Sequence, residues 1–222
     1  MSTSESLRGK IAWITGGGRG LGSAIAERFA AEGAEVVVSS REAGIQADVR
    51  DREQVDAAAA QIRERFGRVD ILVNNAGVYG GSSIEDVDEA AWTDAIETNL
   101  GGPFRCSQAA LKLMPDGGRI IHVGSIHGLV GDAQAAPQCA SKFGLIGLAQ
   151  SMAAVLRPRN ITVNVVCPGS IDPEGGAGLT EQVSRESVAS LCAFLASGEA
   201  AQITGAVVSI PGTTHARITL KP

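Results

Sequence analysis

The stretch TGGGRGLG, residues 15 to 22, begins at the end of the apolar run Ile11–Thr15 and opens the helical pattern Leu21–Ala31. Its glycines permit a tight turn and let backbone amides approach a pyrophosphate at the positive end of a helix dipole. A glycine-rich triplet by itself also occurs in turns with a structural role only. Here a strand precedes the triplet and a helix follows it, so the stretch predicts a dinucleotide-binding loop.

Short β-branched runs alternate with helical patterns along the rest of the chain. This alternation predicts one parallel sheet with helices on both faces, and each strand is too apolar to have one face in water. The expected strands are Ile11–Thr15, Glu35–Ser39, Val69–Val73, Arg119–Val123, Thr162–Val166 and Ala206–Ile210. The expected helices are Leu21–Ala31, Arg52–Phe66, Glu89–Met114, Gln138–Leu156 and Arg185–Ala196.

Composition limits the possible classes of function. With 222 residues, 44% of them apolar and 19% charged, the chain fits a single domain over residues 1–222. A net charge of −5 without any Lys/Arg run argues against nucleic acid or a membrane surface as partner and favours a small-molecule substrate. We find no leader-like or membrane-spanning segment, and so expect a cytoplasmic protein. The four cysteines lack ligand-like spacing, so we expect neither a disulfide nor a metal site.

The cofactor expected at the glycine loop is NADP(H). About twenty residues after the loop, an NAD site would place a carboxylate on the ribose, but the sequence reads Ser39-Ser40-Arg41. The guanidinium of Arg41, with that of Arg19, suits a 2′-phosphate. Both arginines could instead be solvated surface residues, which leaves NAD(H) as the alternative.

Several motifs in order make the chain resemble a short-chain dehydrogenase/reductase of the compact type, from Lys10 to about Gly212. The motifs are TGGGRGLG, Asp48-Val49, Asn74-Asn75-Ala76-Gly77, Asn99, Ser125, Lys142 and Cys167-Pro168-Gly169. The resemblance implies a Rossmann-like, doubly wound parallel sheet, an oxidoreductase acting on a ketone or alcohol, and a homodimer or homotetramer built on the helices Glu89–Met114 and Gln138–Leu156. The cofactor site expected from the loop and the resemblance consists of Thr15, Gly16, Arg19, Gly20, Leu21, Gly22, Ser40, Arg41, Asp48, Val49, Asn75, Ala76, Gly77, Lys142, Pro168 and Gly169.

The same resemblance implies a catalytic group of Asn99, Ser125 and Lys142, with a tyrosine four residues before the lysine as proton donor. That position is Gln138, thirteen residues after Ser125 as in the family, so the alignment cannot be shifted to place a tyrosine there. An amide donates a hydrogen bond but delivers no proton near neutral pH. Loss of a general acid removes about 10²–10⁴ in rate, so we expect impaired or atypical proton transfer.

Three interpretations of Gln138 remain open at this point. It is an introduced substitution, a natural change in an enzyme of non-redox chemistry such as cyclisation, dehydration or isomerisation, or a change tolerated because another group supplies the proton. For the third, His127 is the candidate, two residues after Ser125; a lone loop histidine with a structural role is the alternative. A catalytically silent binding protein is a further possibility.

Two segments are shorter than the family pattern. Between Ser40 and Asp48 only seven residues remain, too few for a parallel crossover with its helix. Either the third strand is absent or it returns as an antiparallel hairpin. We favour absence, and so expect a six-stranded sheet without the third strand and crossover helix, a shallower adenine pocket and weaker cofactor binding. The other shortened segment, about residues 170–186, predicts a clipped substrate lid.

Overall fold

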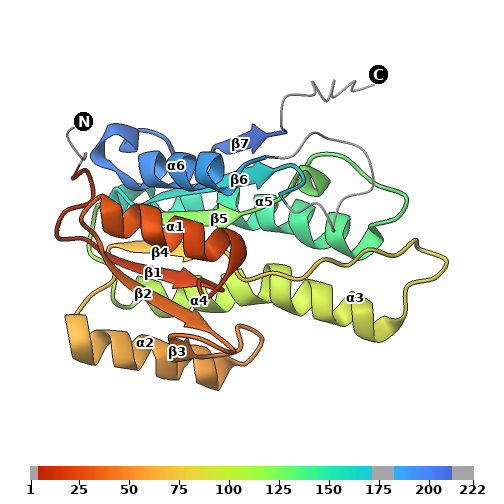
Figure 1. Cartoon of the computed structure of the whole chain (residues 1–222), viewed down its shortest axis with the longest axis horizontal. Helices are drawn as coiled ribbons and strands as arrows, with labels where there is room; N and C mark the ends of the chain where they lie inside the picture. The colour runs from red at the N-terminus through yellow and green to blue at the C-terminus, as the bar shows by residue number, and fades with distance from the viewer. Residues whose placement is uncertain (1–4, 172–182, 212–222) are drawn as a thin grey trace.

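A seven-stranded parallel sheet forms the centre of the protein, which we describe from a computed structural model over residues 5–171 and 183–211 (Figure 1). Its strand order is β3-β2-β1-β4-β5-β6-β7. The strands are β1 Ile11–Thr15, β2 Glu35–Ser40, β3 Ile45–Gln46, β4 Ile71–Asn74, β5 Arg119–Val123, β6 Thr162–Pro168 and β7 Val207–Ile210. The predicted single α/β domain with a doubly wound sheet is therefore confirmed.

Helices cover both faces of the sheet and create two apolar cores. On one face α1 and α6 pack on each other and on residues such as Ile14 and Ile121. On the other face α2, α4 and α5 pack around Trp13 and Leu72. The helices are α1 Gly20–Ala31, α2 Arg52–Phe66, α3 Glu89–Ile96, α4 Gly102–Leu111, α5 Ala136–Leu156 and α6 Arg185–Ala196. Short 3-10 turns lie at Ile126–Gly128, Arg157–Arg159 and Gly198–Ala200.

The strand order reverses between β1 and β4, and this point determines where a ligand can bind. Thr15 at the end of β1 lies between Ser39 of β2 and Asn74 of β4. The loops that follow β1 and β4 run to helices on opposite faces. In open α/β sheets the crevice at such a point is the usual ligand site.

The prediction of a six-stranded sheet is wrong, because a two-residue β3 pairs in parallel with β2 through Ser39–Ile45 and Ser40–Gln46. The crossover helix is absent, as predicted. A tight loop makes the connection: the Ser40 hydroxyl accepts a hydrogen bond from Ala43 N (2.7 Å) and donates one to Ala43 O (2.9 Å). Gly44, at φ +70°, then passes so close to β2 that a Cβ would lie 2.1 Å from Val38 O. The rule that a crossover needs a dozen residues does not apply to so short a strand.

The helix predicted over Glu89–Met114 is divided into α3 and α4 by a π-helical turn, Glu97–Gly101. A π turn inserts one extra residue per turn and commonly occurs at functional sites. Here the turn contains Asn99, which is fully buried. The extra residue thus sets the direction in which the predicted catalytic asparagine points.

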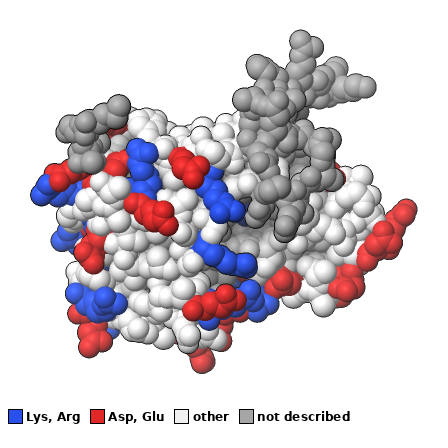
Figure 2. Space-filling model, viewed as in Figure 1, with Lys and Arg blue, Asp and Glu red and all other residues white. Residues whose placement is uncertain are grey.

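Helix α5 is long and apolar enough to cross a membrane by length and composition, as a span of Ala136–Arg159. It packs on β6, and it carries the site residues Gln138 and Lys142. Part of its surface is uncovered within one chain: Phe143 is 47% and Val155 73% exposed. On the face shown in Figure 2, basic and acidic side chains are interspersed and form no broad patch of one sign.

Candidate active site

The glycine loop between β1 and α1 is closely packed against the loop after β4. Asn75 Nδ2 donates to Thr15 O and Gly16 O, both at 3.0 Å, and Thr15 Oγ1 accepts from Asn75 N and Ala76 N. A Cβ on Gly22 would lie 2.3 Å from Gly16 O, so no other residue fits there. The side chains of Thr15 and Asn75 therefore support the loop.

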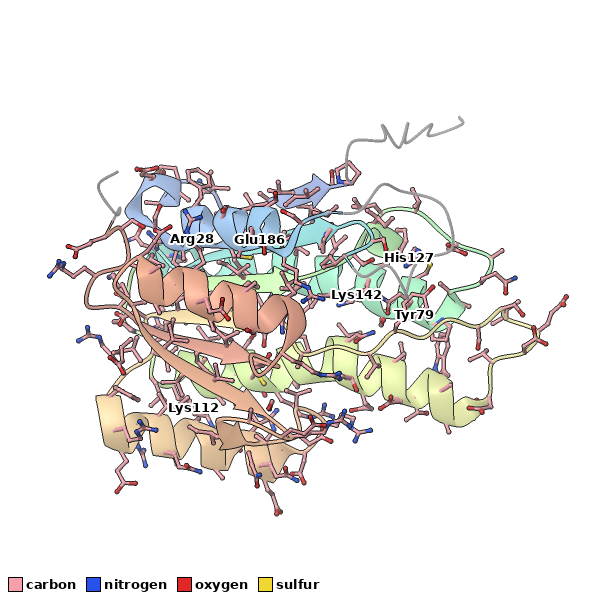
Figure 3. The ribbon with its side chains drawn as sticks, in the orientation of Figure 1. Arg28, Tyr79, Lys112, His127, Lys142 and Glu186 are labelled. Atoms are coloured by element: carbon pink, nitrogen blue, oxygen red, sulfur yellow. The ribbon has the colours of Figure 1, made fainter. Side chains whose placement is uncertain are left out.

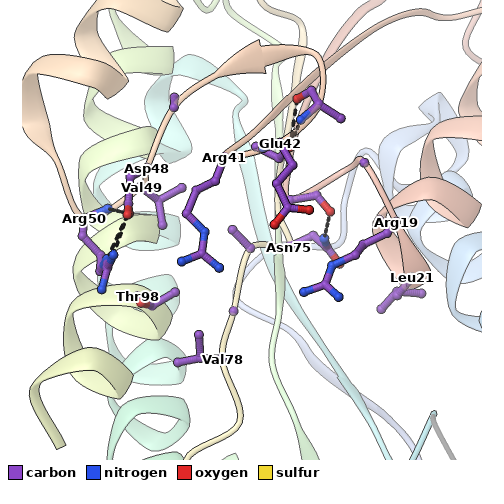
Figure 4. A pocket seen from close by; sticks show the side chains of 18 residues that line it. Arg19, Leu21, Arg41, Glu42, Asp48, Val49, Arg50, Asn75, Val78 and Thr98 are labelled. Carbon is purple, nitrogen blue, oxygen red and sulfur yellow. Dashed lines mark hydrogen bonds and ion pairs between the residues drawn. The ribbon is translucent and has the colours of Figure 1, made fainter. Parts of the chain in front are cut away.

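A cavity of about 290 Å³ lies above this loop at the carboxyl edge of β1, β2 and β4 (Figure 4). Its apolar walls include Leu21, Val49 and Ala76. The start of α1 also borders it, and the Arg19 side chain makes no capping hydrogen bond to the first helical amides. The cavity thus combines an apolar wall with a helix N-terminus. Its other lining residues include Gly16, Gly22, Ser40, Asp48 and Gly77, all predicted for the cofactor site.

Two guanidinium groups extend into the cavity from opposite sides, those of Arg19 and Arg41, with the Glu42 carboxylate between them (Figure 4). Both arginines are exposed, and neither has an ion-pair partner within residues 5–171 and 183–211. These three side chains carry a net charge of +1, which favours an anion. Glu42 is a residue that the sequence analysis missed, because only the turn after β2 directs it into the cavity.

Two residues predicted for the adenine side have their polar groups engaged by neighbours. The Ser40 hydroxyl serves the turn that leads to β3. The Asp48 carboxylate accepts from Arg50 Nε at 3.1 Å and is paired with Arg50 at 2.6 Å, and these hydrogen bonds lower its pKa. Arg50 also pairs with Asp94 at 2.6 Å. Because β3 is present, the sheet extends to the adenine side of the cavity. The missing strand was the predicted reason for weak cofactor binding, and that reason no longer applies.

Asn99 is the residue to which the predicted catalytic Gln138 is bonded, and the backbone of Val78 fixes its orientation. Val78 N donates to Asn99 Oδ1 at 2.9 Å, while Asn99 Nδ2 donates to Val78 O at 3.0 Å. The amide therefore cannot be flipped without losing both bonds. Its Nδ2 also lies 3.1 Å from both Gln138 Oε1 and Ser141 Oγ, so its two hydrogens are shared among three acceptors.

This chain of bonds also fixes the amide of Gln138. Because Asn99 presents an N–H group, the Gln138 atom that faces it must be the oxygen. Ser141 Oγ in turn donates to Gln138 O at 3.0 Å. Gln138 Nε2 has no hydrogen-bond partner in the described part of the chain, and it is the donor left for a ligand. Ser141, fully buried, is a second residue that the sequence analysis did not select.

Lys142 lies one turn after Gln138 on α5 and is buried. Its Nζ donates to Val123 O at 2.8 Å and is close to Gly77, where a Cβ would lie 3.8 Å away. Burial lowers the pKa of Lys142 to about 8 from its ordinary 10.5. The lysine thus connects the catalytic side with the loop after β4.

We expect Lys142→Met to be more stable than the wild type at pH 7 by about 1–2 kcal/mol. The depressed pKa corresponds to a cost on the order of 3 kcal/mol for the buried charge, and the lost bond to Val123 O offsets about 1 kcal/mol of the gain. Between pH 8 and 10.5 the unfolded lysine keeps its proton and the folded one does not, so wild-type stability rises with pH. Urea unfolding at pH 7 and pH 10 measures the free energy of unfolding of both proteins. A stability difference between Lys142→Met and the wild type that is no smaller at pH 10 than at pH 7 would contradict the prediction.

Ser125, His127 and the Pro168-Gly169 turn surround the same edge of the sheet. Gly124 N donates to Val166 O, which holds the end of β5 beside β6 and its Pro-Gly turn. Ser125 Oγ accepts from His127 N at 3.2 Å. Figure 3 shows His127, Lys142 and Tyr79 near one another to the right of the centre of the view, on three different segments. The predicted lid, residues 170–186, lies mostly outside the described residues.

The residues match a known family over most of the chain. The profile of the short chain dehydrogenases matches residues 10–184. The chain belongs to the short-chain dehydrogenase/reductase family. The 3-oxoacyl-[acyl-carrier-protein] reductase FabG of Escherichia coli is 39% identical, over 93% of this chain and 98% of its own. The reductase MabA of Mycobacterium tuberculosis, which carries the same enzyme name, is 37% identical over 90% of both chains.

Solved structures of other short-chain dehydrogenases/reductases have the same fold. A short chain dehydrogenase from Burkholderia cenocepacia in complex with NADP has a TM-score of 0.88 and 36% identity, over 93% of this chain and 98% of that one. A blue fluorescent protein from a metagenomic library in complex with NADPH has a TM-score of 0.87 and 34% identity, over 93% and 98%. Both of these structures contain nicotinamide adenine dinucleotide phosphate, one as NADP and the other as NADPH.

The cavity of this short-chain dehydrogenase/reductase fits such a cofactor. Three features of the cavity suit a pyrophosphate and a 2′-phosphate: a glycine cradle too narrow for a Cβ, a helix N-terminus without a side-chain cap, and two guanidinium groups that have no ion-pair partner in the part of the chain that the structure describes. Gly77 lines this cavity, and a Cβ on it would lie 3.2 Å from Asn99 Oδ1 and 3.8 Å from Lys142 Nζ. The hydrogen-bond donors and positive charges around this cavity therefore suit the binding of NADP(H).

Proposed function

We propose that the chain is an NADP(H)-dependent reductase of a ketone carbonyl, with a 3-oxoacyl thioester as the substrate class. Membership of the family makes it an oxidoreductase. The observation that most supports the proposal is that Asn99 and Lys142 both lie beside Gly77, which lines a cavity with two guanidinium groups that have no ion-pair partner among the described residues. The substrate class follows from the names of the FabG and MabA relatives.

In this proposal the chain's own groups bind and orient the carbonyl. Bound NADPH supplies the two electrons and the hydrogen that reach the carbonyl carbon. Ser125 Oγ and Gln138 Nε2 donate hydrogen bonds to the carbonyl oxygen, since the Gln138 oxygen is held by Asn99. Lys142 holds the ribose side of the cofactor. Gln138 thus polarises the substrate but supplies no proton, and proton transfer is atypical.

The direct experiment follows NADPH absorbance with a 3-oxoacyl N-acetylcysteamine thioester as substrate. We expect one 3-hydroxyacyl product for each NADPH consumed. Because an amide at position 138 also suits a site that stabilises an enolate, the competing function is a non-redox reaction such as dehydration or isomerisation. Conversion of the thioester with no consumption of NADPH would favour that function over ours.

We expect Arg41→Ala to weaken NADPH binding about 10- to 100-fold, because a hydrogen bond to a charged group contributes roughly 1.5–3 kcal/mol. NADH lacks the 2′-phosphate, so its Kd should change little. The matched variant Glu42→Gln removes the one carboxylate that lies between the two arginines and should tighten NADPH binding. Calorimetric titration of the wild type and both variants with NADPH and with NADH measures these affinities. An equal loss of affinity for both cofactors in Arg41→Ala would contradict a contact between Arg41 and the 2′-phosphate.

We also propose a homodimer or homotetramer in which α4 and α5 of two chains pack together. Phe104, Phe143 and Val155 are exposed on these helices, at 44%, 47% and 73%. Light scattering after gel filtration should give twice or four times the 22.7 kDa chain mass. Phe143→Glu should shift the mass toward the single chain; a wild type with the mass of one chain would contradict this assembly.

A further inference from the structure

The proposed reductase site needs a proton donor that Gln138 cannot be, and this inference rests on that proposed function. Around Ser125 the titratable side chains of the described residues are Lys142, Tyr79, His127, Asp132 and Cys167, and the thiol of Cys167 is fully buried. Lys142 is turned to Val123 O and to Gly77 in the loop after β4. Tyr79 is 55% exposed on the opposite loop. That leaves the imidazole of His127 as the group to consider.

His127 and Asp132 form a pair that is largely shielded from water. Nε2 of His127 lies 3.3 Å from Asp132 Oδ2, and the two side chains are only 15% and 19% exposed. The carboxylate is held in place because its Oδ1 accepts from Gln134 N at 2.8 Å, while Asp132 N donates to Cys139 Sγ at 3.3 Å. A carboxylate only accepts hydrogen bonds, so the hydrogen of the neutral ring is on Nε2.

The other ring nitrogen, Nδ1, is buried and has no hydrogen-bond partner in the described part of the chain. Buried polar atoms without a partner are rare and commonly mark a functional group or the place of a ligand. The backbone of His127 is tied to Ser125 Oγ, and its ring centroid is 6.2 Å from that of Tyr79. Nδ1 is therefore the ring atom of the pair that no other described residue engages.

The Tyr79 loop connects this pair with position 138. Ala136 N at the start of α5 donates to Ser82 O, and a Cβ on Gly80 would lie 3.1 Å from Pro137 Cβ and 3.6 Å from Gln138 N. Tyr79 thus has the first turn of α5 on one side and His127 on the other. Figure 3 shows the labelled Tyr79 and His127 near Lys142. The imidazole is thus placed between Asp132 and the Tyr79 loop, on the segment that begins at Ser125.

We propose that His127, oriented by Asp132, is the acid that protonates the substrate oxygen in place of the missing tyrosine. As hydrogen and its electron pair reach the carbonyl carbon from NADPH, the C–O π pair moves onto oxygen. The oxygen takes the proton from Nδ1 of the imidazolium, the ring becomes neutral, and water returns the proton. Asp132 stays ionised throughout and is a positioning residue.

Kinetics of His127→Gln test this assignment. We expect kcat for thioester reduction to fall about 10²-fold or more, the usual effect of removing a general acid, with KM nearly unchanged. Asp132→Asn keeps the side-chain acceptor for Gln134 N but removes the charge, and should lower kcat about tenfold or more. The matched control is Asp116→Asn, an exposed acid paired with Arg159 ahead of β5, which should leave kcat unchanged.

A second set of variants, made in the Gln138→Tyr protein, separates loss of the His127 proton donor from a folding defect. With Gln138→Tyr the tyrosine supplies the proton, so adding His127→Gln should change kcat by no more than about threefold. Full activity of His127→Gln with Gln138 in place would overturn the His127 assignment and leave the reductase proposal standing. No NADPH consumption by the wild type or by Gln138→Tyr would overturn both.

A readout independent of turnover is the tautomer of His127 in the free protein. Nitrogen-15 NMR of histidine-labelled wild type at high pH should show the hydrogen on Nε2. Asp132→Asn should give a mixture of tautomers, because the carboxylate no longer selects one. A wild-type ring with its hydrogen on Nδ1 would overturn the assignment even if His127→Gln were slow.

Discussion

Gln138→Tyr should reduce the 3-oxoacyl thioester about 10²-fold faster than the wild type. A positioned general acid contributes about 10²–10⁴ in rate, and we expect the lower end because His127 already supplies protons in our account. The new hydroxyl would lie one helical turn from Lys142, whose buried charge favours the ionised phenol and so lowers its pKa. The rest of the site, Asn99 and Ser125, is unchanged.

Gln138→Phe is the matched control, since it has the size of tyrosine without the hydroxyl. It should be slower than the wild type, because the amide donor to the carbonyl is also lost. Single-turnover kinetics with saturating NADPH separate the chemical step from binding. Equal rates for the tyrosine and phenylalanine variants would show that position 138 does not supply the proton in either protein.

Gly22→Ala should abolish measurable NADPH binding, which we take as a loss of about 10²-fold or more in affinity. Its Cβ would lie 2.3 Å from Gly16 O and 2.5 Å from Asn75 Nδ2, so the glycine loop must move away from the loop after β4. Overpacking of this kind costs about 1–3 kcal/mol of stability. The cofactor cradle and the Asn75 bonds that support it are lost together.

The matched variant is Gly198→Ala, where a Cβ meets nothing within 4 Å. It should bind NADPH like the wild type. Tryptophan-excited NADPH fluorescence and thermal unfolding measure affinity and stability on the same samples. NADPH binding by Gly22→Ala within threefold of the wild type would contradict the placement of the cofactor on this loop.

The sequence was sufficient for six of the seven strands, because each of them rests on a local apolar pattern. The glycine loop lies between β1 and α1 as predicted, and Gln138 and Lys142 lie one turn apart on α5, while their catalytic roles stay predictions. The third strand was missed because a length rule for crossovers ignores a turn that needs only Gly44 and the Ser40 hydroxyl.

The remaining parts of the site depend on contacts between distant segments. The orientation of the Gln138 amide follows from Val78, 60 positions away, acting through Asn99. The place of Asn99 follows in turn from a π turn that no propensity indicates. Glu42 in the cofactor cavity and Asp132 beside His127 are set by loop geometry. The depressed pKa of Lys142 arises from burial, which only the folded chain defines.

The measurement that tests the central claim most directly is calorimetric titration of the purified protein with NADPH and with NADH. Our account predicts one NADPH bound per chain, at least tenfold more tightly than NADH, because of the 2′-phosphate contact at Arg41 and Arg19. Absence of binding heat with either cofactor, from a protein whose circular dichroism shows the folded α/β domain, would contradict the assignment of this chain as an NADP(H)-dependent reductase.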